Sequence, residues 1–274
     1  MRMTRILTPV LLLLAGLGGS ATAIAAQSSE PPAAERSMSA TSIYELAVAN
    51  PARTDADRAR DATRKPAKVL ELFGIKPGMT VLDMFSGGGY YSELLSYIVG
   101  PDGKVIAHTN TAYGGFVGDE ADKRYAGDRL PNVETLLAEN NELRLRPEVF
   151  DAVMLILSYH DIYYVDEANG WPKIDGPKML AELFEALKPG GILGVVDHYA
   201  AAGSPRETGN TLHRIDAQIV KSELQAAGFV LVDEADFLRN PADDHEKAVF
   251  NPEIRGRTDR FVLKFRKPGA AATL

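Results

Sequence analysis

The sequence predicts an α/β protein built on a doubly wound, mostly parallel sheet. Short apolar segments with the length of buried strands alternate along the chain with segments whose apolar residues recur at helical spacing. This alternation is typical of parallel sheets, because neighbouring parallel strands need a crossover connection, usually a helix. Ligands of such sheets bind at the carboxyl ends of the strands, so the residues that follow each strand are the first candidates for a site.

The expected elements begin with two helices, over residues 41–49 and 54–73. Thr54 suits an N-cap, because its hydroxyl can accept a hydrogen bond from a free amide of the first turn. A turn from Gly74 to Gly78 then ends the second helix and leads into the first strand. The expected strands are residues 80–84, 104–108, 133–138, 152–157, 192–197, 229–234 and 260–266. The clearest helices between them begin near residue 90, span residues 177–187, and end at residue 228.

The first residues are expected to be a secretory signal peptide. Arg2 and Arg5 precede an apolar run over residues 6–17, and small residues follow it. Cleavage is expected after Ala25, with a second small-residue pair two positions earlier; a retained N-terminal anchor is the alternative. The expected organisation is a signal peptide over 1–25, a flexible leader over 26–40, a single domain over 41–268 and a tail over 269–274.

Charge and composition exclude several classes of partner. The net charge is −7, and loss of Arg2 and Arg5 with the signal peptide would make it −9 (−7 − 2). A chain this acidic lacks the basic excess that binds nucleic acid. No cysteine is present, so there is neither a disulfide framework nor a lipidated cysteine. We expect a periplasmic or secreted protein with a small-molecule partner and no stable membrane association after signal cleavage; the oligomeric state stays open.

The stretch VLDMFSGGGYYSELL, residues 81–95, carries the most informative motif. Asp83 ends the first strand, and Gly87 and Gly89 follow in the turn before the helix that begins near Tyr90. Glycines let the backbone approach a ligand, and the first amides of a helix favour an anionic group. In the dinucleotide fingerprint the acid instead comes about twenty residues after the glycines, which disfavours a nicotinamide cofactor. The order suits a ligand with a cationic centre and a carboxylate, such as S-adenosyl-L-methionine; a glycine turn without a ligand is the alternative.

Two later motifs, read with the first, give a family resemblance. The chain resembles the class I S-adenosylmethionine-dependent methyltransferases over residues 54–267, through Asp83-x-x-x-Gly87-x-Gly89, Phe150-Asp151-Ala152-Val153 and Leu187-Lys188-Pro189-Gly190-Gly191. More narrowly, it is similar to exported bacterial predicted methyltransferases, through Asp61-Ala62-x-Arg64-Lys65-Pro66, Gly88-Gly89-Tyr90-Tyr91 and Arg255-Gly256-x-Thr258-Asp259-Arg260-Phe261. The resemblance implies a Rossmann-like, seven-stranded sheet with an antiparallel last strand, here with an N-terminal helical extension.

The resemblance also assigns residues to the cofactor. Asp83, Gly87 and Gly89 match the first motif and would hold the methionine end, beside Tyr90 at the start of the helix. Phe85 stands where the superfamily has its first glycine.

Polar residues after the next two strands would face the rest of the cofactor. No acid ends the second strand, so Asn110 would hydrogen-bond a ribose hydroxyl without the charge of a carboxylate. Glu139 and Asn140 stand where an acid commonly receives the adenine amino group. Arg64 is expected on the cofactor side, where a guanidinium can bind a carboxylate. Ordinary loop hydrogen bonds are the alternative for Asn110 and Glu139.

The loop after the fourth strand, LSYHDIYY, is the candidate catalytic segment. In the superfamily this loop lies beside the transferred methyl, which would place Tyr159, His160 and Asp161 near the acceptor. Methyl transfer to oxygen or nitrogen often needs a base, and His160 titrates in the right range. The alternative is a histidine that caps the strand end, with tyrosines packed under a lid.

A second group follows the fifth strand at Asp197-His198-Tyr199. We expect His198 to be catalytic as a proton-accepting pair with Asp197; a buried structural pair is the alternative. No tight ligand spacing supports a metal, so none is expected. The sequence therefore predicts an S-adenosylmethionine-dependent methyltransferase with an unidentified small-molecule acceptor. The alternative is an exported, non-catalytic protein that keeps the fold to bind another small ligand.

Overall fold

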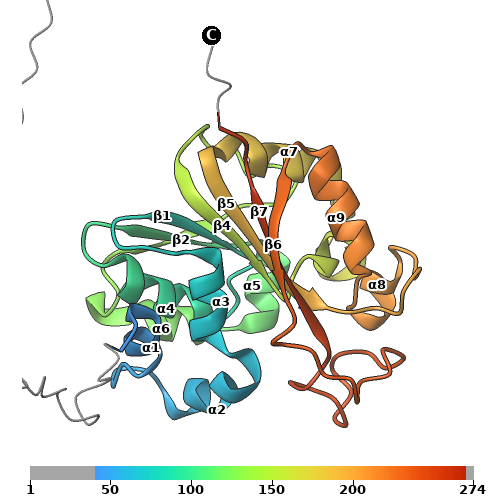
Figure 1. Cartoon of the computed structure of the whole chain (residues 1–274), viewed down its shortest axis with the longest axis horizontal. Coiled ribbons are helices and arrows are strands. Elements are labelled where there is room, and N and C mark those ends of the chain that lie inside the picture. The colour runs from blue at the N-terminus through green and yellow to red at the C-terminus, as the bar shows by residue number, and fades with distance from the viewer. Residues whose placement is uncertain (1–40, 270–274) are drawn as a thin grey trace, which may run out of the picture. The chain divides into compact units, whose positions relative to one another are not determined.

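A computed structural model describes residues 41–269, which lie in one compact unit. Its centre is a seven-stranded sheet with the strand order β3-β2-β1-β4-β5-β7-β6 (Figure 1). β7 runs antiparallel to both of its neighbours, β5 and β6, whereas the five strands of the sheet from β3 to β5 pair in parallel. The strands are β1 (Thr80–Met84), β2 (Lys104–Thr109), β3 (Val133–Leu137), β4 (Phe150–Ile156), β5 (Leu187–His198), β6 (Val230–Ala235) and β7 (Arg260–Arg266).

Helices cover both faces of this sheet (Figure 1). They are α1 (Ile43–Val48), α2 (Asp55–Arg64), α3 (Pro66–Phe73), α4 (Tyr90–Val99), α5 (Thr111–Val117), α6 (Glu120–Tyr125), α7 (Gly176–Ala186), α8 (Thr208–Leu212) and α9 (Ala217–Ala226). Single 3₁₀ turns occur at η2 (Ala126–Asp128), η3 (His160–Tyr163) and η4 (Glu167–Asn169). The predicted fold class is confirmed, including the reversed last strand and the N-terminal helical extension.

The core has two halves because successive side chains of a strand point to opposite faces. On β4, Ala152 and Met154 pack with α1, α3 and α4, whereas Val153 and Leu155 pack with α7 and α9. These four side chains of β4 are all buried. Because both faces of the sheet are covered, the side chains that remain open to a ligand lie at the carboxyl ends of the strands, where the chain turns into its loops.

The predicted helix over residues 54–73 is wrong in one respect, because it is broken at Lys65. This residue has a left-handed backbone (φ 44°), and Pro66 begins α3 at its first position. A proline disfavours the helical conformation for the residue before it, so the chain turns between α2 and α3. The N-cap prediction holds, since Thr54 accepts a hydrogen bond from the Asp57 amide at 3.1 Å. The break places the end of α2, with Arg64, at the edge of the cavity described below.

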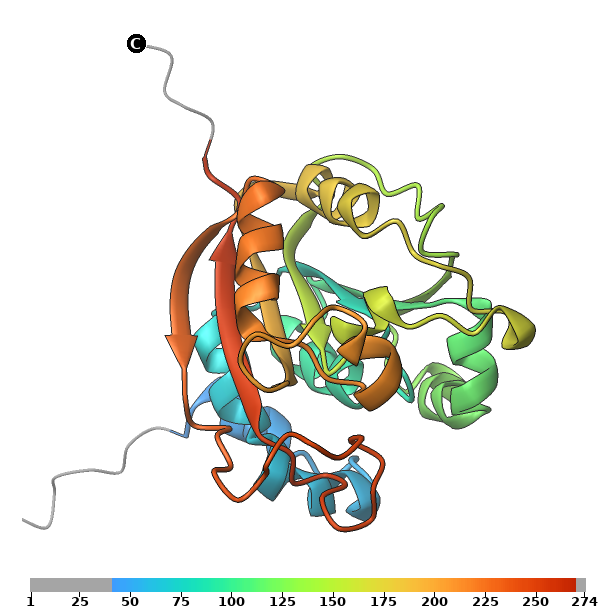
Figure 2. The same ribbon diagram turned by 90° about the vertical axis from the view of Figure 1, so that its right-hand side faces the viewer.

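The segment between β6 and β7, residues 236–259, loops out from the sheet and lies beside α2 (Figures 1 and 2). Lys65 donates to the Phe237 carbonyl at 2.6 Å, and Arg260 donates to the Thr63 carbonyl at 3.3 Å. The predicted signal peptide and leader, residues 1–40, lie outside the described residues. Across residues 41–269 the helices are all too short or too polar to cross a bilayer.

Candidate functional site

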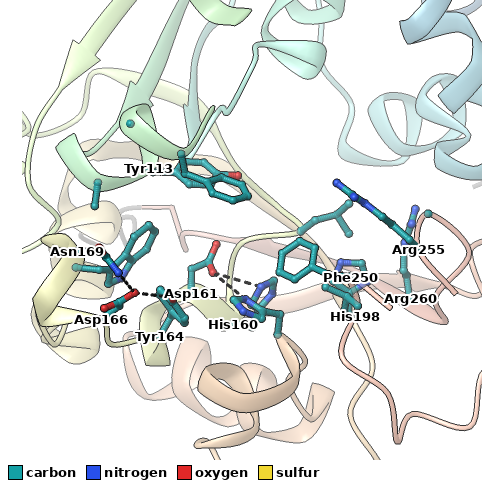
Figure 3. A pocket seen from close by; sticks show the side chains of 18 of the residues that line it. Tyr113, His160, Asp161, Tyr164, Asp166, Asn169, His198, Phe250, Arg255 and Arg260 are labelled. Atoms are coloured by element: carbon teal, nitrogen blue, oxygen red, sulfur yellow. Dashed lines mark hydrogen bonds and ion pairs between the residues drawn. The ribbon is translucent and has the colours of Figure 1, made fainter. Parts of the chain in front are cut away.

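A cavity of about 950 Å³ opens at the carboxyl ends of β4 and β5 (Figure 3). Its volume lies in the range of sites that hold a drug-sized molecule. Three kinds of side chain line it: aromatic rings, a group of imidazoles with a carboxylate, and guanidinium groups. The principal ones are Tyr113, Phe116, Tyr164, Trp171, His160, Asp161, His198, His213, Phe250, Arg64, Arg255 and Arg260.

His160 is held between two carboxylates. Its backbone N–H and its Nδ1 each lie 2.8 Å from an oxygen of Asp197, and its Nε2 lies 3.3 Å from Asp161 Oδ1. Burial by itself would lower the pKa of His160, but the charges of Asp197 and Asp161 outweigh it and raise the pKa to about 9. His160 is therefore an imidazolium at neutral pH, so it supplies positive charge and cannot accept a further proton.

His198 has the opposite protonation state. Its ring is buried, its Nδ1 lies 2.6 Å from Thr258 Oγ1, and its ring centre lies 5.8 Å from that of His160. Burial and the nearby charges of Arg260 and His160 hold the pKa of His198 well below its usual range. His198 is thus the neutral imidazole of the cavity.

The predicted pair of Asp197 with His198 is wrong. The two residues are consecutive on β5, and consecutive strand side chains point to opposite faces. The Asp197 carboxylate reaches His160 on the neighbouring loop instead. The Asp197 carboxylate thereby favours the protonated form of His160, which was expected to be the free base. The neutral imidazole is His198 instead.

His213 joins this group from outside the predicted segments. It follows α8 with a left-handed backbone (φ 53°), and its Nδ1 lies 3.8 Å from Asp161 Oδ1. Ligand atoms of His160, Asp161 and His213 all lie within 4.8 Å of one another, close enough for one metal ion. The expectation of no metal stays a prediction. His213 is not among the predicted site residues, because nothing local to it in the sequence indicates a contact with the loop after β4.

Tyr159 points away from the cavity. It is fully buried, and its hydroxyl donates to Glu223 of α9 at 2.9 Å. The 3₁₀ turn that begins at His160 directs the two neighbouring side chains to different sides. The structure therefore brings three of the four predicted catalytic residues to the cavity, namely His160, Asp161 and His198.

The glycine loop has the backbone that was expected, but side chains cover it. Gly87 and Gly89 have φ values of 57° and 78°. Carbon atoms added at Gly88 and Gly89 would collide with Glu120 and Tyr125 of α6, and one added at Gly87 would lie 3.5 Å from Tyr113 Oη. The segment from α5 to α6 thus packs directly on the loop.

Phe85 extends this cover. It has a left-handed backbone (φ 51°), is 3% exposed, and stacks on Trp171 at 5.9 Å between ring centres. Its ring also meets Tyr113 edge-on at 6.0 Å. Among the described residues, the buried polar atoms without a hydrogen-bond partner include Tyr125 Oη and Trp171 Nε1, both of which belong to the cover. These side chains together cover the face of the glycine loop on which the methionine end of S-adenosylmethionine was expected to bind.

Apart from Arg64, the other predicted cofactor residues with polar side chains lie at or after the ends of β1, β2 and β3, and they hydrogen-bond side chains of the protein itself. Asp83 accepts from Ser92 Oγ at 2.6 Å, and burial raises the pKa of Asp83 to about 7. Asn110 caps α5 and donates to Asn140 at 2.7 Å, while Glu139 accepts from Thr111. Tyr90 begins α4 and hydrogen-bonds Asp61. Of the predicted cofactor residues, Arg64 alone lines the cavity.

Comparison with known proteins identifies relatives of this chain in sequence and in fold. The family model of protein-L-isoaspartate(D-aspartate) O-methyltransferase matches residues 35–113. The ubiquinone/menaquinone biosynthesis C-methyltransferase of Ectopseudomonas mendocina is 28% identical over 197 residues, which cover 71% of this chain and 65% of that protein. The same enzyme of Pseudomonas paraeruginosa is 29% identical over 130 residues, or 47% of this chain and 45% of its own length. The chain thus spans less than two thirds of these relatives.

Solved structures agree in fold. An S-adenosylmethionine-dependent methyltransferase from Aquifex aeolicus superposes with a TM-score of 0.51 at 24% identity, over 76% of this chain and 98% of that one. One from Mesorhizobium loti gives a TM-score of 0.52 at 15% identity, over 76% and 99%. With its sheet order, its glycine loop and these sequence matches, the chain belongs to the class I S-adenosylmethionine-dependent methyltransferase superfamily.

Proposed function

We propose that the protein transfers a methyl group from S-adenosylmethionine to a small molecule bound in the cavity. The observation that carries this proposal is the neutral His198 beside the charged His160, in a cavity at the carboxyl ends of β4 and β5. The cofactor would supply the methyl group, once the cover over the glycine loop has moved.

The chain's own residues have separable roles in this proposal. His198 can accept a hydrogen bond from a bound acceptor, because its ring is neutral and borders the cavity. The charges of Arg260 and His160 that lower its pKa oppose full transfer of the proton unless the bound ligand offsets them. Asp197 holds His160 in place with two hydrogen bonds, so that a fixed positive charge can orient an acceptor oxygen. Tyr113, Tyr164 and Trp171 provide an apolar surface for the body of the ligand.

Cofactor binding is the first test. Trp171 is the only tryptophan of the chain, and it stacks on Phe85 at the covered loop. We therefore expect S-adenosylhomocysteine to change the tryptophan emission and to bind with a dissociation constant in the micromolar range by isothermal titration. Release of S-adenosylhomocysteine from S-adenosylmethionine, followed over a panel of small acids, phenols and amines, then identifies the acceptor. No binding at millimolar concentration would rule out the enzyme.

A non-catalytic ligand-binding role is the second candidate, and the Phe85 ring over the glycine loop is the observation that favours it. A protein that binds small molecules in the cavity but never S-adenosylhomocysteine would have this role.

We also propose that the protein acts in the periplasm or outside the cell, on a small molecule rather than on nucleic acid or a membrane. The basic, apolar and small residues of positions 1–25 and the net charge of −7 support this location and partner. Cell fractionation with N-terminal sequencing of the mature chain tests it. An uncleaved chain in the cytoplasm would contradict the proposal.

A further inference from the structure

Among the described residues, three arginines are buried, and one of them has no acidic partner. Arg53 lies 2.7 Å from Asp61, and Arg214 is held by Asp243 at 2.9 Å through both nitrogens. Arg260 is 4% exposed, yet across residues 41–269 no carboxylate lies within ion-pair distance of it. Its donors reach only Thr258 Oγ1 at 3.2 Å and the Thr63 carbonyl at 3.3 Å.

A buried guanidinium without a counter-charge costs free energy, because neutral acceptors do not replace its hydration. The contrast with Arg214 shows that this chain can place a carboxylate beside a buried arginine. The missing carboxylate at Arg260 therefore indicates a position that an external anion completes.

Arg64 increases the positive charge at the same place. It lines the cavity with Arg260, lies 4.7 Å over the Tyr90 ring, and makes no ion pair among the described residues. Burial and the charge of Arg64 lower the pKa of Arg260 to about 10. The exposed Arg255 stands at the rim beside Arg260.

The cavity is divided by charge (Figure 3). Arg255 and Arg260 lie together at one end, next to His198 and Phe250, whereas Asp166 lies at the other end and Asp161 lies between them. Asp161 already faces His160 and His213. No carboxylate of the cavity lining is therefore available to neutralise Arg260 and Arg64.

We propose that Arg260 and Arg64 form a subsite for the carboxylate group of a small molecule bound in the cavity. A planar guanidinium can hold both oxygens of a carboxylate, and the second charge strengthens that contact. The carboxylate can come from the cofactor's own methionine end or from an acidic acceptor. This inference does not depend on methyl transfer, because it concerns only the charge of the cavity.

The test uses two probes of equal shape, benzoate and its neutral counterpart benzamide, with the full chain. We expect benzoate to bind the wild type at least about tenfold more tightly than benzamide, and Arg260→Gln or Arg64→Gln to remove that preference. Arg257→Gln is the matched control, because Arg257 is exposed in the same loop and does not line the cavity. Equal binding of the two probes, or loss of benzoate binding in Arg257→Gln as well, would overturn the subsite.

Stability provides an independent measurement. If Arg260 belongs to an anion-binding subsite, Arg260→Gln in dilute chloride buffer should unfold at the same temperature as the wild type or at a higher one, because the substitution removes an unneutralised buried charge. If Arg260 instead serves to join Thr63 to Thr258, the unfolding temperature should fall by several degrees, about 2–4 °C for each kcal/mol lost, and the subsite is refuted.

Two nucleoside ligands distinguish the sources of the carboxylate. Methylthioadenosine lacks the amino-acid part of S-adenosylhomocysteine. If the cofactor supplies the carboxylate, Arg260→Gln weakens S-adenosylhomocysteine binding and leaves methylthioadenosine unchanged; if the acceptor supplies it, both nucleosides bind the variant as they bind the wild type. Equal weakening of both overturns the assignment. If neither nucleoside binds, the proposed methyl transfer fails, but the benzoate result still decides the subsite.

Discussion

Replacing Phe85 with glycine should lower the stability of the protein and raise its affinity for the cofactor. The ring is 3% exposed, and truncation of a buried phenylalanine costs about 3–5 kcal/mol. Glycine removes the cost of a left-handed backbone, about 1 kcal/mol. It also makes the unfolded chain more flexible, which lowers stability by a similar amount, so these two contributions nearly cancel. We therefore expect a loss of about 3–5 kcal/mol in the free energy of unfolding, measured in urea.

The same substitution removes two of the contacts that hold the cover closed, with Trp171 and Tyr113. Each aromatic pair contributes about 0.5–1.5 kcal/mol, so the closed arrangement loses about 1–3 kcal/mol. If that arrangement dominates the free protein, the apparent affinity for S-adenosylhomocysteine should rise between about fivefold and about 150-fold in isothermal titration.

Leu183→Ala is the control for stability alone. Leu183 is fully buried on α7 and does not line the cavity, so its truncation should cost about 2–5 kcal/mol without changing cofactor affinity. An unchanged or weaker affinity in Phe85→Gly, with the expected loss of stability, would refute the reasoning that Phe85 supports a cover over the glycine loop.

Four further outcomes test the description of the site and the core. Asp83 has a pKa of about 7 in the folded protein, against an ordinary value of 3.8. Between about pH 4 and pH 7 the unfolded chain has therefore released a proton that the folded chain keeps. The free energy of unfolding should fall as pH rises through this window, by at most about 1.4 kcal/mol per pH unit. Urea unfolding of Asp83→Asn should lack this contribution, and an identical pH profile would contradict it. His198→Gln should lower the rate of methyl transfer by about 10²-fold or more in a kinetic assay, and its affinity for S-adenosylhomocysteine, measured by isothermal titration, should be unchanged. A loss of affinity as large as the loss of rate would indicate a structural role. Asp243→Ala should cost about 3–5 kcal/mol in thermal unfolding, because it leaves the fully buried Arg214 without its partner, and a cost below about 1 kcal/mol would refute that account. Treatment with EDTA should leave turnover unchanged, because proton transfer to His198 needs no metal; loss of turnover that zinc restores would instead indicate an ion at His160, Asp161 and His213.

Local patterns sufficed to predict the fold. The strands were placed to within a few residues because buried parallel strands are short apolar runs bounded by glycine and proline. β5 was the exception at its start, five residues earlier than expected, because the Lys188-Pro189-Gly190-Gly191 turn lies inside the strand. The helix break at Lys65 was foreseeable from Pro66, since the residue before a proline avoids helical dihedrals.

The sequence by itself determined which chemical groups reach the carboxyl edge of the sheet, because a strand's end and the next residues are set by the local pattern. Asp83, the glycine loop, His160, Asp161 and His198 were all found in this way. Tertiary structure decided what each group faces. The Asp197 carboxylate bonds the imidazole of His160 and not that of its neighbour His198, Tyr159 turns to α9, Phe85 stacks on Trp171, and Arg260 is buried without an acid. These outcomes depend on contacts between segments that lie tens of residues apart, and on burial, which sets both pKa and charge balance; neither is encoded in the spacing of residues along one segment.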